Sequence, residues 1–351
     1  MRSARRGAGM QGHGLFDEVK SVGLSQIAAA RARLDGLSLL TPLVGCEIAP
    51  PGKILRLKLE NLQQIGSFKT RPIANAVLSK NRAELSAGIY TTSTGNSALG
   101  VAWMAHRLGV SATAVVPTNA PEAKLEKLRR LGTRIETRSP QAWWRAIETG
   151  TLEDQVGVYI DAVRDPAALA GDATLGVEIL EQWPEVEAIL IPFGGGGLAC
   201  GIGCAVRALN PSVKIIACEL AGAHPLQSAF AAGRPVLTAH DAGFVSGIGF
   251  GQVLPEMWPL ARAMIDEVVT VSLAQVAQAI KWLAENNRIV AEGAGAVSVA
   301  AALAGQYSSS KICAVISGGN IDSDVFASIL QGHVPGQPAR AHDEVAHRHQ
   351  D

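Results

Sequence analysis

The chain has 351 residues, of which 48% are hydrophobic, and 31 lysines and arginines balance 31 aspartates and glutamates. This length predicts about two domains of roughly 150 residues, each able to bury a core. The balanced charge excludes a basic footprint for nucleic acid or anionic lipid, so we expect neither nucleic-acid nor membrane partners.

The termini and the cysteines predict a protein of a reducing compartment. Residues 1–14 carry arginines but no apolar stretch, which predicts a disordered tail rather than a secretory signal. The five cysteines are odd in number and form no CxxC pair, so reduced thiols are favoured over disulfides or zinc ligands. We therefore expect a cytoplasmic location. Residues 335–351 are polar and predict a second tail.

Short apolar runs rich in β-branched residues alternate with helical segments along the chain. Strands are predicted at residues 54–59, 88–92, 112–116, 188–192, 213–218, 268–271 and 312–316. Apolar residues at helical spacing lie between most of them, and Ser272 with Gln275 forms a capping-box pattern at one helix start. This alternation predicts mainly parallel sheets covered on both faces by helices.

One uncharged stretch, residues 188–206, is long enough to raise the question of a membrane span. Pro192 and four consecutive glycines lie in its middle. They would break a spanning helix and leave backbone groups unpaired in lipid. The stretch is therefore predicted to be a buried strand, a loop and a helix.

The first of four glycine-linked clusters is Gly66-Ser67-Phe68-Lys69-Thr70. A glycine turn followed by Ser67 as helix N-cap would place Lys69 in the first helical turn. There the positive end of the helix dipole opposes protonation, which suits a lysine that acts as a nucleophile in Schiff-base chemistry. From these five residues alone, an ordinary solvated lysine remains the alternative.

The next two clusters predict anion binding. Ser93-Thr94-Gly95-Asn96 opens a helix, where N–H groups, two hydroxyls and an amide suit a carboxylate or phosphate; a plain N-cap loop is the alternative. Gly194-Gly195-Gly196-Gly197, followed by Leu198, exposes successive N–H groups at a helix start and predicts a phosphate site. This run matches neither the dinucleotide fingerprint nor the P-loop.

The fourth cluster is Ile316-Ser317-Gly318-Gly319-Asn320, which ends the last predicted strand. Glu292-Gly293-Ala294-Gly295 precedes it at a helix start. In open parallel sheets, ligands bind at the carboxyl ends of strands, where the last three clusters all lie. We expect them to share one crevice, with a simple strand-end turn as the alternative.

In this order, the four clusters resemble the motifs of the fold-type II pyridoxal-phosphate enzymes, in the branch of threonine and serine dehydratases and serine racemase. The resemblance covers about residues 40–331. It implies an α/β fold like the tryptophan synthase β chain, with two open, mainly parallel twisted sheets flanked by helices. Residues 15–86 and 162–334 would form the large cofactor-binding domain, and residues 87–161 a small mobile substrate domain. The resemblance also suggests a homodimer.

The resemblance implies a role for each site residue. Lys69 would form the Schiff base with pyridoxal 5'-phosphate and act as the catalytic base. The cofactor would be bound by Phe68, Lys69, Asn96, Gly194, Gly195, Gly196, Gly197, Leu198, Glu292 and Ser317. The amino-acid substrate would be bound by Ser93, Thr94, Gly95 and Ser97, with Thr94 as a second catalytic residue. A hydroxyl such as Ser317 cannot hold the ring nitrogen protonated as a carboxylate would, which favours prompt loss of a β-substituent.

The implied activity is that of a dehydratase, an ammonia-lyase that removes the β-hydroxyl of a threonine- or serine-like amino acid to give a 2-oxo acid and ammonia. Ser97 stands where the dehydratases usually carry histidine, which loosens the substrate prediction. The racemase carries serine just before the loop glycine, at the position where this chain has Thr94. A racemase, or a lyase or β-replacement enzyme for another β-substituted amino acid, therefore stays an alternative, and a non-catalytic cofactor-binding protein is a minor one.

The family's cation site is altered in this chain. Glu219 and Ala223 match it, but Pro225 stands where the family has an acid. Because a proline side chain cannot ligate a cation, no metal is expected.

Overall fold

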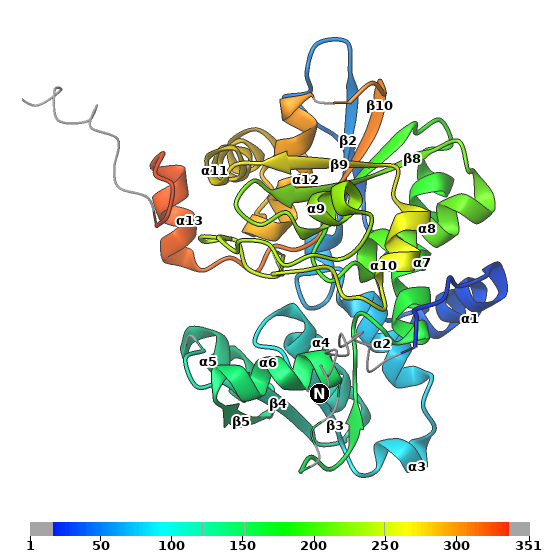
Figure 1. Cartoon of the computed structure of the whole chain (residues 1–351), viewed down its shortest axis with the longest axis vertical. Coiled ribbons are helices and arrows are strands. Elements are labelled where there is room, and N and C mark those ends of the chain that lie inside the picture. Colours follow the sequence, from blue (N-terminus) through cyan, green and yellow to red (C-terminus); the bar gives the residue numbers. More distant parts are fainter. Residues whose placement is uncertain are drawn as a thin grey trace, which may run out of the picture.

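The computed structural model describes residues 17–336, except Pro121, Thr151, Glu153, Gly249 and Gln306. Two mainly parallel sheets flanked by helices lie one above the other in Figure 1, with the larger sheet at the top. This arrangement confirms the predicted fold class. The tail predicted over residues 1–14 lies outside the described residues, as do residues 337–351 of the second predicted tail.

The larger sheet has six strands in the order β1-β2-β10-β7-β8-β9. They are β1 (Leu43–Gly45), β2 (Ile54–Leu59), β7 (Ala188–Pro192), β8 (Lys214–Leu220), β9 (Glu267–Val271) and β10 (Lys311–Ile316). Only β1 and β2 pair in the antiparallel direction among these strands. In β7, Ile189 and Ile191 belong to one apolar cluster, and Ala188 and Leu190 to another. A strand that is apolar on both faces needs helices on both sides of the sheet.

Helices cover both faces of this sheet. The first apolar cluster joins it to α1 (Leu24–Leu34), α7 (Pro166–Gln182), α8 (Gly197–Leu209), α9 (Pro225–Ala232) and α10 (Trp258–Met264). The second joins it to α11 (Leu273–Trp282), α12 (Gly293–Ala304) and α13 (Ser323–Leu330). The α11 helix continues into the π-helical turn Leu283–Asn287 and begins with the predicted capping box of Ser272 and Gln275.

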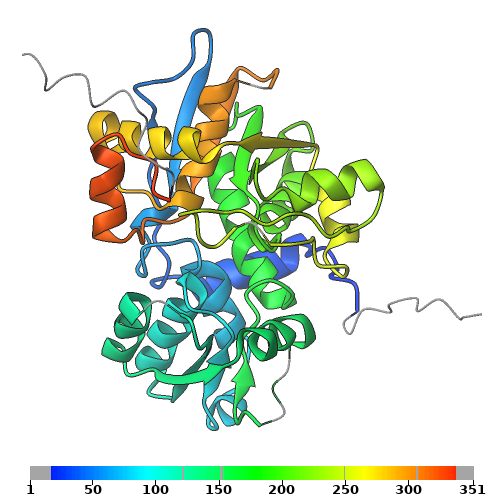
Figure 2. The ribbon, with the colours of Figure 1, turned by 60° about the vertical axis from the view of Figure 1, so that its left-hand side comes forward.

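The smaller sheet has four parallel strands in the order β5-β4-β3-β6. They are β3 (Ile89–Thr91), β4 (Ala112–Pro117), β5 (Arg134–Arg138) and β6 (Val158–Tyr159). Its helices are α2 (Thr70–Leu78), α3 (Arg82–Leu85), α4 (Asn96–Leu108), α5 (Glu122–Arg130) and α6 (Pro140–Thr149). In Figure 2, α1 crosses the junction between the two halves. Its residues Ile27 and Ala30 pack in the larger core, and Leu34 packs in the smaller one.

The strands of the smaller sheet all come from one continuous part of the chain. Every strand within residues 87–161 belongs to the smaller sheet, and every other described strand belongs to the larger one. We propose that residues 87–161 form a domain that closes over the substrate. The α2 helix, however, lies outside these bounds and still contributes Ile73 and Val77 to the core of the smaller sheet.

All seven predicted strands are confirmed, and three strands were missed. β1 and β6 have three and two residues, too short for a periodic signal. β5 is an edge strand with the sequence RIETR, whose charged residues lie at the border of the sheet. Charged edge strands protect a sheet from further pairing but hide its hydrophobic pattern.

The uncharged stretch at residues 188–206 forms β7, a glycine turn and most of α8, as predicted. Among the described helices, none combines the length and the hydropathy needed to cross a membrane.

Candidate active site

The last three glycine-linked clusters lie after the carboxyl ends of parallel strands, as the sequence predicted, and the lysine turn follows the carboxyl end of β2. The ends of β2 and β10 are side by side, since Leu59 pairs with Ile316. β7 pairs with the other edge of β10 and leads into the glycine run before α8. β3 of the smaller sheet leads into the loop before α4. The carboxyl edge of a parallel sheet is the usual place for a ligand site.

The lysine turn differs from its predicted form. Lys69, not Ser67, is the N-cap residue of α2. Ser67 forms a β-bridge with Gly318, and the N–H of Phe68 donates to the carbonyl of Ser317 at 2.8 Å. This pairing holds Ser67 in a bridge to the segment that follows β10, and a turn over Phe68 and Lys69 leads from it into the helix. The prediction of Ser67 as the cap is wrong, and its buried hydroxyl has no hydrogen-bond partner among the described groups.

The amino group of Lys69 is poorly hydrated. Its Nζ lies 4.8 Å from the centroid of the Phe68 ring and 3.4 Å from the carbonyl oxygen of Ala162. Burial lowers the pKa of Lys69, and the negative charges of Asp172 and Asp161 partly oppose this shift. A lysine with a lowered pKa was predicted, but the main cause is desolvation rather than the helix dipole. Such an amine is uncharged in a larger fraction of molecules and can act as nucleophile or base.

The glycine run forms a tight cradle at the start of α8. Gly196 is the N-cap residue with φ of 97°, a conformation that favours glycine. A Cβ atom on Gly194 would lie 2.7 Å from the carbonyl oxygen of Gly247. A Cβ atom on Gly195, Gly196 or Gly197 would likewise come within 3.2 Å of a neighbouring group, so only glycine fits along this run, which leads into the buried Leu198 at the start of α8. This is the geometry that binds a phosphate at a helix N-terminus.

An amide network joins the two halves of the site. The Asn96 side chain at the start of α4 donates to Glu292 Oε1 at 2.6 Å, and Asn320 Nδ2 donates to Asn96 Oδ1 at 2.8 Å. Asn320 also donates to the carbonyl of Ile65, next to the lysine turn. Asn96, Glu292 and the lysine turn are thus held together, as their predicted roles require. Asn320 was quoted in the fourth cluster but received no role, because its partners lie more than 200 residues away.

The predicted substrate loop stays open to solvent. Ser93, Thr94, Gly95 and Ser97 are all partly exposed. Ser93 Oγ accepts a hydrogen bond from the N–H of Gly95, which is the N-cap residue of α4. The first N–H groups of α4 have no intrahelical partners, so the loop can take a carboxylate. The role of Thr94 stays a prediction.

Ser317 is almost fully buried at the end of β10, with 3% of its surface exposed. Gly318 follows Ser317 and packs between the lysine turn and the start of α12. A Cβ atom on Gly318 would overlap Glu292 and Ser67. A Cβ atom on Gly295 would overlap the carbonyl of Gly318. The close approach fixes the position of Ser317 beside the lysine turn. The lysine, the glycine cradle and this hydroxyl together fit a ligand that carries a phosphate, a carbonyl carbon and a polar ring.

Sequence reasoning missed one acidic group in this region. Asp172 on α7 is fully buried near the glycine cradle and interacts electrostatically with Lys69. A single acid among the small and apolar residues 167–177 was the available signal.

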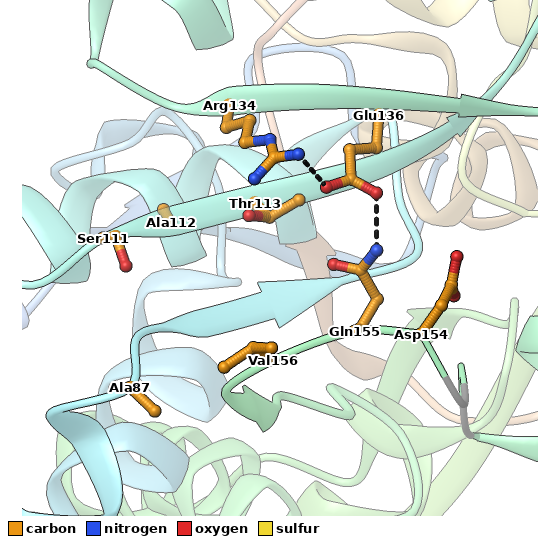
Figure 3. Close-up of a pocket in the computed structure, with 9 residues that line it drawn as sticks. All are labelled: Ala87, Ser111, Ala112, Thr113, Arg134, Glu136, Asp154, Gln155 and Val156. Atoms are coloured by element: carbon orange, nitrogen blue, oxygen red, sulfur yellow. Dashed lines mark hydrogen bonds and ion pairs between the residues drawn. The ribbon is translucent and has the colours of Figure 1, made fainter.

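A pocket lies elsewhere, at the amino ends of β4 and β5. Figure 3 shows it lined by Ala87, Ser111, Thr113, Arg134, Glu136 and Gln155, among others. Arg134 and Gln155 both bind the Glu136 carboxylate. Three polar side chains of this pocket thus bind one another. No residue predicted for the active site lines the pocket.

Glu219, the residue matched above to a cation site, binds backbone N–H groups of a helix. Its two carboxylate oxygens each accept a hydrogen bond of 2.9 Å, from the N–H groups of Leu226 and Gln227 at the start of α9. Pro225 is the first residue of that helix. Burial raises the pKa of Glu219 from 4.5 to about 7, although the two N–H donors oppose this shift.

The raised pKa predicts a pH-dependent cost in stability. The folded protein favours protonated Glu219. The stability that this protonated carboxyl contributes is therefore fully present below the pKa of Glu219 in the unfolded chain, and it is lost as the pH rises through the folded pKa of about 7. We expect the free energy of unfolding of Glu219→Gln, relative to the unmodified protein, to rise by about 3 kcal/mol between about pH 4 and pH 8. Urea unfolding at several pH values measures this difference, and parallel pH curves would contradict it.

Comparisons with known proteins agree with this geometry. The sequence profile of the family described as "Pyridoxal-phosphate dependent enzyme" matches residues 37–318. The L-threonine ammonia-lyase of Thermotoga maritima is 35% identical over 305 residues, which are 86% of this chain and 74% of that protein. The serine racemase of Oryza sativa subsp. indica is 31% identical over 336 residues, 93% of this chain and 97% of that protein. The structure of maize serine racemase has a TM-score of 0.79 and 30% identity, and the match covers 90% of this chain and 98% of that one.

Proposed function

Because the chain belongs to the family of pyridoxal-phosphate-dependent enzymes, we propose that it is an ammonia-lyase for a threonine- or serine-like β-hydroxy amino acid. The products would be a 2-oxo acid and ammonia. The observation that carries the proposal is the Lys69 amino group, whose pKa is lowered by burial and which lies against the Phe68 ring and the carbonyl of Ala162. A relative named L-threonine ammonia-lyase at 35% identity supports the choice of reaction.

The residues would hold the cofactor as follows. The backbone N–H groups of Gly194–Gly197 and Leu198 would bind the phosphate at the N-terminus of α8. Phe68 would pack against the ring, while Asn96, positioned by Glu292 and Asn320, would bind its hydroxyl. Ser317 would donate to or accept from the ring nitrogen. Bound pyridoxal 5'-phosphate supplies an electron-withdrawing ring that acidifies the Cα–H bond of the substrate.

The chain's own groups then act on the substrate. The open N–H groups at the start of α4, with Ser93, Thr94, Gly95 and Ser97, orient the carboxylate. Lys69 Nζ takes the Cα proton, a step for which a lysine with a lowered pKa is suited. Ser317 would offer the ring nitrogen a neutral hydroxyl instead of a carboxylate, which would favour loss of the β-hydroxyl.

Racemisation is the second candidate, favoured by the relative named serine racemase, which matches nearly the whole chain. It needs a second proton donor on the face of the substrate opposite Lys69. The Thr94 hydroxyl, partly exposed in the loop before α4, is the group proposed for that role. A lyase or β-replacement activity on another β-substituted amino acid would use the same residues.

A substrate panel separates these candidates. The purified protein with pyridoxal 5'-phosphate is incubated with both enantiomers of serine and threonine and with related β-substituted amino acids. We expect 2-oxo acid and ammonia in equal amounts, measured together with the enantiomer ratio of the remaining substrate. Enantiomer formation without ammonia would replace the lyase by a racemase, and no reaction with any substrate would contradict both.

We also propose a reducing cytoplasmic location and a homodimer. The five cysteines all lie in the described part of the chain, and none is bonded to another; four are buried. This fits a compartment where thiols stay reduced. Light scattering on the purified chain measures the mass of the assembly.

A further inference from the structure

Asp172 stands apart from the other buried carboxylates of the larger half. It is fully buried on α7, and neither of its oxygens has a hydrogen-bond partner among the described groups. Glu60 and Glu178, by contrast, are buried in ion pairs with Arg71 and Lys58. A buried carboxylate without a partner is costly, so the surroundings of Asp172 must supply either a proton or a positive charge.

Close packing of α7 on α8 places Asp172 at the glycine cradle. A Cβ atom on Gly201 would lie 2.6 Å from Asp172 Cβ, and one on Gly197 would lie 3.2 Å from Asp172 Oδ2. The carbonyl oxygen of Ala162 is also 3.2 Å from that position at Gly197. Since Lys69 Nζ lies 3.4 Å from the same carbonyl, the carboxyl of Asp172 and the amine of Lys69 both lie near the Ala162 carbonyl at the start of α8.

The other charged groups near this spot already have partners. Arg71 on α2 donates its N–H groups to Glu60, Glu178, Thr174 and the carbonyl of Leu39. Asp161, which also acts on Lys69, binds Arg164.

Cys200 on α8 interacts electrostatically with Asp172, and burial raises the pKa of Cys200, so it is an uncharged thiol. Lys69 is therefore the cation that remains for Asp172 among the groups that interact with it.

We propose that Asp172 is a positioning residue that acts through Lys69: as its buried charge partner, it sets the pH range in which the Lys69 amino group is uncharged and able to react. The inference rests on the proposed role of Lys69 as the residue that holds the cofactor. An ionised Asp172 keeps Lys69 as an ammonium ion, whereas a protonated Asp172 releases the amine. The pair titrates together.

The directions of the two pKa shifts agree with this assignment. Burial raises the pKa of Asp172, and Lys69 is the strongest charge that opposes the rise. Burial lowers the pKa of Lys69, and Asp172 is the strongest charge that opposes the fall. Each group thus stabilises the charged form of the other.

The test measures the reactivity of Lys69 without any substrate. Full-length protein freed of cofactor is labelled with trace acetic anhydride across a pH series, and acetylation of the Lys69 peptide is quantified by mass spectrometry. In Asp172→Asn, which keeps the side-chain size and removes the charge, we expect the midpoint of Lys69 reactivity to move to lower pH by about one to three units. An unchanged midpoint in folded protein overturns the proposal.

Glu181→Gln is the matched control. It removes the same charge from the same helix, but Glu181 is half-exposed in a surface pair with Arg31. Its midpoint is expected to stay at the unmodified value. An equal shift in both variants would mean a general charge effect and would also overturn the proposal.

A reciprocal variant covers the case in which Asp172→Asn does not fold. In cofactor-free Lys69→Met, Asp172 loses its counter-charge and should keep its proton to higher pH. The stability that protonated Asp172 contributes to the fold is lost as pH rises, so urea unfolding should show this loss at higher pH than in the unmodified protein. If the loss of stability occurs at the same pH in Lys69→Met as in the unmodified protein, the proposal is overturned. These measurements use no amino-acid substrate. If the substrate panel fails, it therefore contradicts the proposed function and leaves the proposal on Asp172 to be decided by the labelling and unfolding experiments.

Discussion

Replacement of Lys69 by alanine is expected to lower turnover by a factor of about 10³ or more, because we propose this residue both as the cofactor's attachment point and as the base. The long-wavelength absorbance of the cofactor linked to Lys69 should also disappear. Absorbance spectra of the purified variant and assays of 2-oxo acid formation measure the two effects.

Lys281→Ala is the control for this variant. Lys281 lies on α11, and its Nζ is 3.8 Å from Oε1 of Glu285 in a surface ion pair. It is not among the residues of the candidate active site. The control should retain both absorbance and activity, and both variants should keep the circular dichroism of the unmodified protein. If Lys69→Ala kept the absorbance band and the turnover, the assignment of the whole site would be wrong.

Replacement of Arg71 by leucine is expected to destabilise the fold by about 3–5 kcal/mol, because it leaves two buried carboxylates without their main cation. Arg71 contacts Glu60 at 2.8 and 3.0 Å and Glu178 at 2.7 and 2.8 Å. Its positive charge lowers the pKa of Glu60 in spite of complete burial. Urea unfolding gives the free-energy difference.

A surface ion pair provides the comparison for Arg71. Arg31 binds both oxygens of Glu181 at 2.6 and 2.7 Å, but both side chains are half-exposed. Arg31→Leu should therefore cost no more than about 1 kcal/mol. Equal costs for Arg31→Leu and Arg71→Leu would show that the buried network does not support the fold.

The buried network also explains how the lysine turn is positioned. Arg71 follows Lys69 by two residues, and Glu60 follows β2 directly. Lys58 on β2 donates to Glu178, which Arg71 also binds. The strand before the turn and the helix after it are thus both tied to α7, so the position of Lys69 relative to α7 and Asp172 is fixed by ion pairs and not only by apolar packing.

The sequence by itself determined the features that depend on local chemistry. Apolar runs and helical periodicity located seven strands and the helices between them, because burial on a sheet or helix face imposes its spacing on neighbouring residues. The glycine run of 194–197 and the lysine turn could be recognised since backbone freedom and side-chain chemistry are properties of a short segment. The location of strand ends on one sheet edge then predicted a single crevice.

The tertiary structure decided what depends on partners far apart in the chain. The α2 helix begins at Thr70, after the bridge of Ser67 with Gly318, and no local pattern reports that pairing. Asn320 supports Asn96 across more than 200 residues, and Asp172 becomes a partner of Lys69 only when α7 packs on α8. Desolvation, which lowers the pKa of Lys69, is likewise a property of the folded surroundings and not of the residues next to it.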